Sequence, residues 1–248
     1  MPTVIEKIER FIGYGRNQIE QILCLDGLDK SPLPLYEYKK LLLAALIDRY
    51  SRYAYPREQP RARYMAFLKA FGNWQSFDRV CLTHLAELLR KCPEPEFQNL
   101  RAYVQQQLAS WRDGDVILIS RDPRASEVGN HWPQGKCFKE PISGVTPDRL
   151  THGSLFYAYR CSLAHELSAP GFTWDMLDRD EPFYISGVEN VSGTEWNQRW
   201  ELVYPLGFFT SISRECLSSF ESYLKDNLID PYELTRKGEF WIDTMNTE

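Results

Sequence analysis

Residues 41–47 read Leu-Leu-Leu-Ala-Ala-Leu-Ile and form the most apolar part of a longer stretch that predicts a helix over 35–55. Apolar side chains occur almost all round this helix at 41–47, so we expect it to lie deep in the core. Tyr55-Pro56 marks its end, because a proline disfavours helical backbone in the residue before it. The apolar run is far shorter than the ~18 residues that a membrane span needs.

The chain on both sides of this helix is also predicted to be helical. Val4 to Leu25 carries isoleucine and phenylalanine at near-helical spacing, with Gly13 and Gly15 as weak points. Shorter helices follow at 61–71, 77–91 and 96–111, separated by Gly72-Asn73 and by Pro93 and Pro95.

The second half combines an irregular stretch, a helix and a small β element. Residues 113–145 are rich in proline and glycine, and within them 115–120 is either a buried strand or a loop that docks on the core. Thr146 opens a helix that runs to about Leu167, with Pro147 in its first turn. Strands are predicted at 182–187 and 199–204, a turn region at 190–197 and a last amphipathic helix at 208–228.

These patterns predict one mainly α-helical domain over residues 1–248. Its helical core comprises about 1–112 and 146–230, with the irregular stretch 113–145 between them. A small β-hairpin is inserted at about 181–205, before the last helix.

The composition excludes several classes of protein. Hydrophobic residues make up 43% of the chain and charged residues 25%, which excludes a disordered or fibrous protein. The formal net charge of −5 excludes a broadly basic surface, so any contact with nucleic acid must be local. The start of the chain has no basic and apolar regions of a secretory signal, so we expect a cytoplasmic protein without a membrane partner.

No motif in the sequence predicts a metal or another cofactor. The six cysteines lie far apart and lack zinc-site spacing, so we expect buried, reduced thiols. Gly13-Tyr-Gly15 lacks the remaining residues of a P-loop or dinucleotide fingerprint, and Asp26 to Asp29 lacks the spaced ligands of a calcium loop.

The most informative segment is 152–167, His-Gly-Ser-Leu-Phe-Tyr-Ala-Tyr-Arg-Cys-Ser-Leu-Ala-His-Glu-Leu. Arg160 and His165 lie toward the end of a helix that is otherwise mainly apolar and aromatic. Desolvating both side chains is costly unless they are hydrogen-bonded or face a cleft. Arginine can hold a phosphate through two parallel hydrogen bonds, and histidine can exchange a proton near neutral pH. The pair therefore indicates phosphodiester chemistry.

This segment resembles the Arg-x(4–6)-His signature of the HEPN superfamily, small helical domains found in toxins, abortive-infection proteins and CRISPR-linked effector ribonucleases. The resemblance implies a HEPN-type helical bundle that forms a homodimer, in which the signature helices of both copies build one site that cleaves RNA without a metal. Arg160 would orient and neutralise the scissile phosphate. His165 would act as acid or base on the 2′-hydroxyl or the leaving 5′-oxygen, giving a 2′,3′-cyclic phosphate end. A toxin or antiviral-defence role follows from the same resemblance, with an antitoxin or regulatory protein as a partner.

Two positions inside the segment support or modify this interpretation. Many active family members carry Asn, Asp, His or Ser directly after the arginine, where this chain has Cys161, whose thiol is a poor hydrogen-bond partner. Ser162 is a small polar residue within the apolar helix. Arg160 and His165 lie roughly 140° apart around an ideal helix, so they converge on one phosphate only at a distorted helix end or across two chains.

Two other pairs match the same spacing. Arg79 and His84 are predicted to lie on one helix and compete with the first pair, whereas Arg124 and His131 fall in the glycine- and proline-rich stretch and are not expected to be helical. The apolar helix, Ser162 and the helix-ending Pro170-Gly171 favour the pair Arg160 and His165.

A basic, tyrosine-rich stretch at 49–69 offers a second place for RNA. Arginines beside aromatic faces suit single-stranded RNA, and the predicted contacts are Arg49, Arg52, Tyr53 and Arg57. The alternative is a solvated connection whose tyrosines cap the core. Asp48 either orients a site arginine or histidine or forms a routine ion pair.

A different class of function remains open on the sequence. Arg160 and His165 could be structural residues, satisfied by a carboxylate such as Glu166 or by backbone carbonyls. The protein would then be a non-catalytic helical interaction module that dimerises and binds a protein partner or a nucleotide. Solvent exposure of His165 distinguishes the two, because a histidine sealed inside one chain cannot act on RNA.

Overall fold

A computed structural model describes residues 2–25, 33–133, 141–142, 144–170, 179–190 and 196–234. Within these ranges the protein is mainly α-helical with a small antiparallel sheet, which confirms the predicted fold class. The described helices are α1 (Val4–Leu23), α2 (Leu33–Ala54), α3 (Pro60–Phe71), α4 (Leu82–Arg90), α5 (Gln98–Leu108), α6 (Ala125–Gly129), α7 (His152–Glu166) and α8 (Leu206–Asp226).

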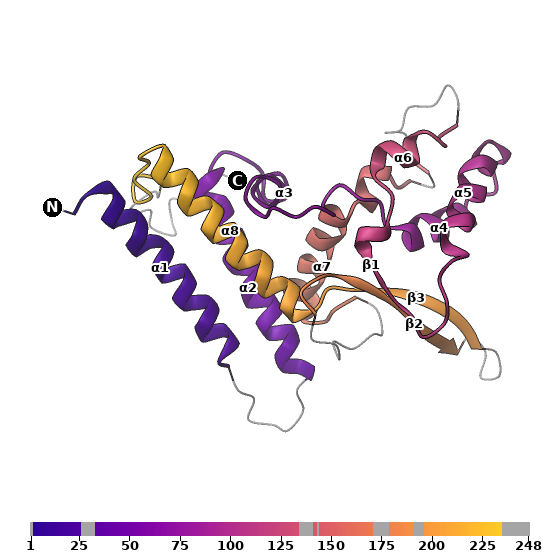
Figure 1. The fold of residues 1–248 in the computed structure, drawn as a ribbon, viewed down its shortest axis with the longest axis horizontal. Helices are drawn as coiled ribbons and strands as arrows, with labels where there is room; N and C mark the ends of the chain where they lie inside the picture. Colours follow the sequence, from indigo (N-terminus) through magenta and orange to yellow (C-terminus); the bar gives the residue numbers. More distant parts are fainter. Residues whose placement is uncertain are drawn as a thin grey trace.

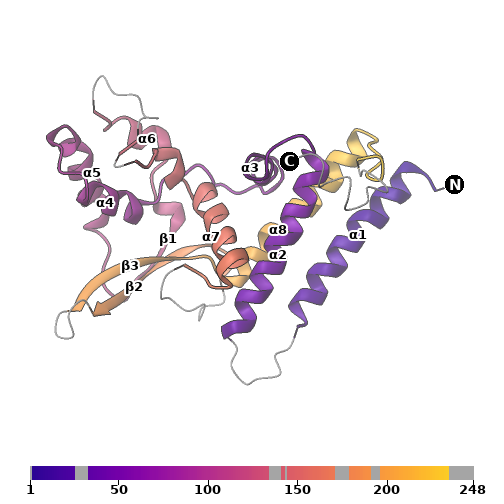
Figure 2. The same cartoon turned by 180° about the vertical axis from the view of Figure 1, so that it is seen from behind.

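The long helices gather at one end of the molecule and the sheet lies at the other (Figure 1). α8 packs against α1, α2 and α3, and α7 packs against α2 and α3. Figures 1 and 2 both show α7 between the long helices and the part that contains the sheet, α4, α5 and α6. The helix that carries Arg160 and His165 therefore joins the two ends of the molecule.

The apolar run of α2 is buried on one side and exposed on the other. Leu43, Ala44 and Ile47 are almost fully buried in the core formed with α1, α3, α7 and α8. Leu42, in contrast, is 41% exposed, and Ala45 is also exposed. The helix therefore lies in the core as predicted, but its apolar run is buried on one side only.

The sheet contains one strand more than the predicted hairpin. Strands β2 (Phe183–Asn190) and β3 (Trp196–Val203) pair antiparallel, with Phe183 opposite Val203. β1 (Val116–Leu118) adds to the free edge of β2, with Val116 opposite Ile185, in the order β1-β2-β3. Of the two alternatives for 115–120, the strand is correct. The centre of the predicted turn, 191–195, lies outside the described residues.

Differences from the predicted helices occur where the backbone pairs with distant segments. α4 begins at Leu82 rather than near Phe77, because the Val80 amide donates to the Pro123 carbonyl and the Cys81 amide to the Leu150 carbonyl. A 3-10 turn, Pro147–Leu150, precedes α7. Residues 125–129, predicted to be irregular, form the short helix α6, whose first turn is closed by Glu127.

Gly153 allows the close approach of α7 to Phe77, and this contact gives a testable effect on stability. A Cβ at position 153 would lie 2.5 Å from the Phe77 ring, whereas a Cβ at Gly13, in α1, meets nothing within 4 Å. Because Phe77 is itself buried, we expect Gly153→Ala to lower the free energy of unfolding by about 1–3 kcal/mol through overpacking. Gly13→Ala is the matched control and should raise it by about 0.5–1 kcal/mol. Equal effects in urea titrations would contradict this packing.

Candidate functional site

Arg160 points from α7 toward α2 and α3 and is held there by a carboxylate. Its Nη2 donates to Asp48 Oδ2 at 3.1 Å, and its side chain is 21% exposed. Desolvation opposes the charge of the guanidinium, but Asp48 and the neighbouring Cys161 and Tyr64 outweigh it, so the pKa of Arg160 is raised. Arg160 is therefore a fixed cation at the protein surface.

Asp48 is the common partner of three arginines. Besides Arg160, the Arg63 guanidinium lies 3.5 Å from Asp48 Oδ1, and that of Arg52 lies 3.9 Å from Oδ2. We call these four residues the arginine cluster. One carboxylate cannot neutralise three guanidinium groups, so the cluster keeps a positive charge. The Nε of Arg63 is buried without a hydrogen-bond partner in the described part of the chain. Of the two alternatives predicted for Asp48, the structure shows the ion pair, and a role in orienting a site arginine or histidine stays a prediction.

The cluster continues along α7 and α3 through an aromatic ring. Arg160 lies 5.9 Å from the centroid of the Tyr157 ring and Arg61 lies 5.7 Å from it. Arg61 also donates to the Ser154 hydroxyl at 3.2 Å. Within an acidic chain, this side of α7 is therefore locally basic.

His165 lies in the last turn of α7 and is exposed. No hydrogen bond or ion pair joins it to Arg160 among the contacts of these two described residues. The Ser162 hydroxyl lies 3.0 Å from Glu166 Oε2 and 3.1 Å from the Ser168 carbonyl, so it faces the helix end rather than Arg160. Cys161 is half-buried, with its sulfur 4.0 Å from Arg160 Nη1. One chain alone therefore does not bring Arg160 and His165 together.

The predicted RNA contacts divide between two places. Arg52 belongs to the arginine cluster, and Arg57 is exposed beyond the end of α2. Arg49 faces α1 instead, donating to Gln18 Oε1 at 3.0 Å and lying 5.2 Å from the Tyr14 ring centroid. Tyr53 packs edge-on against Phe11, with ring centroids 4.9 Å apart. These four side chains do not form one surface.

The tyrosines of the basic stretch mostly serve the core. Tyr50 is 1% exposed and Tyr64 is fully buried. Burial excludes both rings from stacking on bases and raises the pKa of Tyr50 to about 12. For these two residues the alternative, tyrosines that cap the core, is correct.

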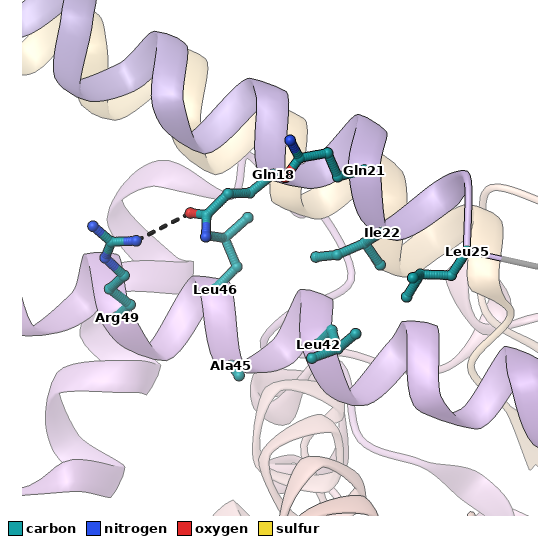
Figure 3. A pocket seen from close by; sticks show the side chains of 8 residues that line it. All are labelled: Gln18, Gln21, Ile22, Leu25, Leu42, Ala45, Leu46 and Arg49. Carbon is teal, nitrogen blue, oxygen red and sulfur yellow. Dashed lines mark hydrogen bonds between the residues drawn. The ribbon is translucent and has the colours of Figure 1, made fainter.

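Arg49 lines a groove between α1 and α2 (Figure 3). The groove has a volume of about 380 Å³. Its walls are mostly apolar, and amide side chains from α1 and Arg49 from α2 lie at one end, as Figure 3 shows. The lining residues are Gln18, Gln21, Ile22, Leu25, Leu42, Ala45, Leu46 and Arg49.

The pair Arg79 and His84 does not lie on one helix, which corrects the prediction. Arg79 precedes α4, and its Nη1 donates to the Asp122 carbonyl. His84 Nδ1 lies 2.9 Å from the Cys81 sulfur. Arg124 and His131 flank α6, and His131 stacks on Tyr103 with ring centroids 4.0 Å apart.

A buried polar network was not predicted from the sequence. His152 Nε2 lies 2.7 Å from Asp122 Oδ2, and both side chains are fully buried. The Tyr184 hydroxyl donates to the same oxygen and lies 3.1 Å from the Cys81 sulfur. His152 is the first residue of the segment 152–167. A polar residue at the start of an apolar helix was the one feature of the sequence that could have indicated this network. Nothing near Asp122 in the sequence marks it as its partner.

The described residues contain no group of three or more histidine, cysteine or acidic side chains arranged to hold a metal ion. The described cysteines carry free thiols, and Cys137 lies outside the described residues. No helix in the described ranges has the length and apolar character that a membrane span requires.

Comparison with known proteins leaves the family open. No family model matches the sequence, and neither a curated protein nor a solved structure matches it. The resemblance to the HEPN superfamily therefore stands on the segment 152–167 alone.

Proposed function

We propose that the protein is a metal-independent endoribonuclease that acts as a homodimer of HEPN type. The observation that carries the proposal is the arginine cluster, in which Asp48 holds Arg160 at the surface while positive charge remains in excess. A fixed guanidinium with spare charge is suited to a phosphodiester. The exposed ring of His165 on the same helix adds a group that can exchange protons with RNA.

The reaction requires two proton transfers around one phosphorus atom. The 2′-oxygen attacks phosphorus and loses its proton to a base, while the P–O5′ bond breaks and the leaving oxygen receives a proton from an acid. In a dimer, His165 of one copy acts beside Arg160 of the other copy, as the base or the acid of this step, and water carries the second proton. Arg160 stabilises the negative charge on the phosphate oxygens. Because Arg160 and His165 point apart in one chain, the proposal requires that α7 of two copies face each other.

A cleavage assay in EDTA tests this function. Wild type should cut single-stranded RNA and leave 2′,3′-cyclic phosphate ends, and the double variant Arg160→Gln/His165→Asn should not. Circular dichroism should show the same fold for both. Loss of cleavage in EDTA would contradict the metal-independent mechanism, and equal cleavage by the double variant would contradict the site.

The α1–α2 groove favours a second function, a non-catalytic interaction module for a protein partner. Leu25 is 40% exposed and Leu42 is 41% exposed at this groove, and contiguous apolar surface of this kind often marks an interaction site. A toxin or antiviral-defence role, with an antitoxin or regulatory protein as partner, is compatible with either function. RNA that stays intact under all conditions, together with a stable dimer, favours the module.

A further inference from the structure

The outward face of α2 carries a narrow row of side chains at coiled-coil spacing. The members follow one another at intervals of four, three, four and three residues and are Tyr38, Leu42, Ala45, Arg49 and Arg52. Tyr38 is 49% exposed and Leu42 is 41% exposed, and the side chain of Arg52 is 66% exposed. The residues between the members of the row are buried or half-buried. Such a row is the seam along which one helix packs against another, and we call it the α2 seam.

The neighbouring helix α1 widens this face with a second row at the same spacing. Its members, which run on to the residues just after the helix, are Tyr14, Gln18, Gln21 and Leu25. Tyr14 is 53% exposed and Leu25 is 40% exposed. Figure 3 shows how this row and the α2 seam line the two sides of one groove. Exposed apolar surface that continues over two helices is typical of an interaction site.

The order of side chains along the α2 seam makes it complementary to a second copy of itself. Ala45 lies at the centre, with Tyr38 seven residues before it and Arg52 seven residues after it. In an antiparallel pair with a two-fold axis at Ala45, each Tyr38 ring meets the Arg52 guanidinium of the other copy, a cation–π contact. Leu42 meets the alkyl stem of Arg49. A parallel pair would instead place arginine opposite arginine, which is unfavourable.

We propose that two copies of this chain dimerise through the α2 seam, antiparallel and with the two-fold axis at Ala45. The small side chain of Ala45 lets the two backbones approach closely at the axis. The α1 row flanks the contact on one side and adds to its area. The arginine cluster borders it on the other side, because Arg52 belongs both to the seam and to the cluster.

The arrangement also names the partner surface of the proposed nuclease, and this part of the inference rests on the proposed function. α7 runs antiparallel to α2, because Arg160 binds Asp48 and the Ala169 amide donates to Glu37 Oε1 at 3.3 Å. His165 therefore lies beside the part of α2 between Glu37 and Asp48. The two-fold axis brings that part of the other copy to the level of Asp48. Arg160 of one copy then lies level with His165 of the other, on the same side of the interface.

Analytical ultracentrifugation of the full chain tests the interface. Wild type should be a dimer at micromolar concentration. Leu42→Glu brings two carboxylates into the apolar part of the seam and should raise the Kd of the dimer by about 10²- to 10⁴-fold. Leu228→Glu is the matched control, since Leu228 follows α8 and is 66% exposed, and it should dimerise like wild type. Circular dichroism should show the same fold for all three chains.

A cysteine at the centre of the seam tests the position of the axis. In a chain with Cys24→Ser, which removes an exposed native thiol, Ala45→Cys should form a disulfide between two copies under mild oxidation. The reason is that a residue on a two-fold axis meets its own copy. Ser218→Cys, at an exposed position of α8, is the control and should stay reduced.

An exchange of charge tests the antiparallel order. Tyr38→Arg places a cation opposite Arg52 of the other copy and should weaken the dimer. Tyr38→Arg/Arg52→Glu should restore it, because each new arginine then meets a carboxylate of the other copy. In a parallel pair the double variant would be weaker than either single variant.

The proposal is overturned if wild type stays monomeric at high micromolar concentration, or if Leu42→Glu leaves the dimer intact. A dimer that cross-links through Ser218→Cys rather than Ala45→Cys would also overturn it. RNA cleavage separates this inference from the proposed function. A dimer through the seam that leaves RNA intact keeps the interface and removes the nuclease, whereas a monomer that cleaves RNA removes both the interface and the shared site.

Discussion

His165→Asn should lower the rate of RNA cleavage by about 10²- to 10⁴-fold, the range typical of losing a general acid or base. Asparagine keeps a hydrogen-bonding side chain of similar size but cannot exchange a proton near neutral pH. Because His165 is exposed at the end of α7, the substitution should leave the fold and its stability almost unchanged. Initial rates on a fluorescent RNA oligonucleotide in EDTA measure the effect.

The matched control for this prediction is His131→Asn. His131 is also exposed, but it contacts Tyr103 far from the arginine cluster. Cleavage by this variant should equal wild type. A His165→Asn variant that is folded and fully active would remove His165 from the mechanism.

Asp122→Ala should lower the free energy of unfolding by about 2–6 kcal/mol, because it leaves the buried His152 and Tyr184 without a hydrogen-bond acceptor, at about 1–3 kcal/mol for each. The carboxylate is fully buried and binds His152 at 2.7 Å. It also accepts the hydroxyl proton of Tyr184. Without it, two buried polar groups lose their acceptor, and these groups join the start of α7 to β2. Such a loss is a large fraction of the ~5–15 kcal/mol that stabilises a typical domain.

Asp78→Ala provides the comparison with an exposed pair. Asp78 lies 3.0 Å from Lys69 Nζ, and the two side chains are 65% and 63% exposed. Its removal should cost about 0–1 kcal/mol, because water and salt screen such a pair. Chemical denaturation of both variants measures the difference. Similar losses for Asp78→Ala and Asp122→Ala would contradict a stabilising role for the buried network.

Local patterns in the sequence were sufficient to predict most of the fold. The spacing of apolar residues in 4–25 and 35–55 predicts α1 and α2 to within two residues at each boundary. The hairpin also follows from alternation in 182–187 and 199–204. The predicted start of α4 was wrong, because long-range backbone hydrogen bonds to Pro123 and Leu150 hold residues 80 and 81 outside the helix. A sequence pattern carries no information on such partners.

The candidate site was less predictable than the fold. The sequence indicates Arg160 and His165 through chemistry and spacing, and Asp48 as a group that could orient an arginine. It does not reveal that Arg63 shares this carboxylate or that Arg49 faces the opposite groove, since both depend on how α1 and α3 pack against α2.

In the proposed dimer, Arg160 of one copy works with His165 of the other. Mixing the chains Arg160→Gln and His165→Asn, each inactive alone, shows whether the two residues act across the dimer. A mixed dimer keeps one intact Arg160 and one intact His165, on different chains. About half of the dimers in an equal mixture are mixed, so cleavage should return to roughly a quarter of the wild-type rate. A folded, dimeric mixture that stays inactive would contradict a site shared between two copies.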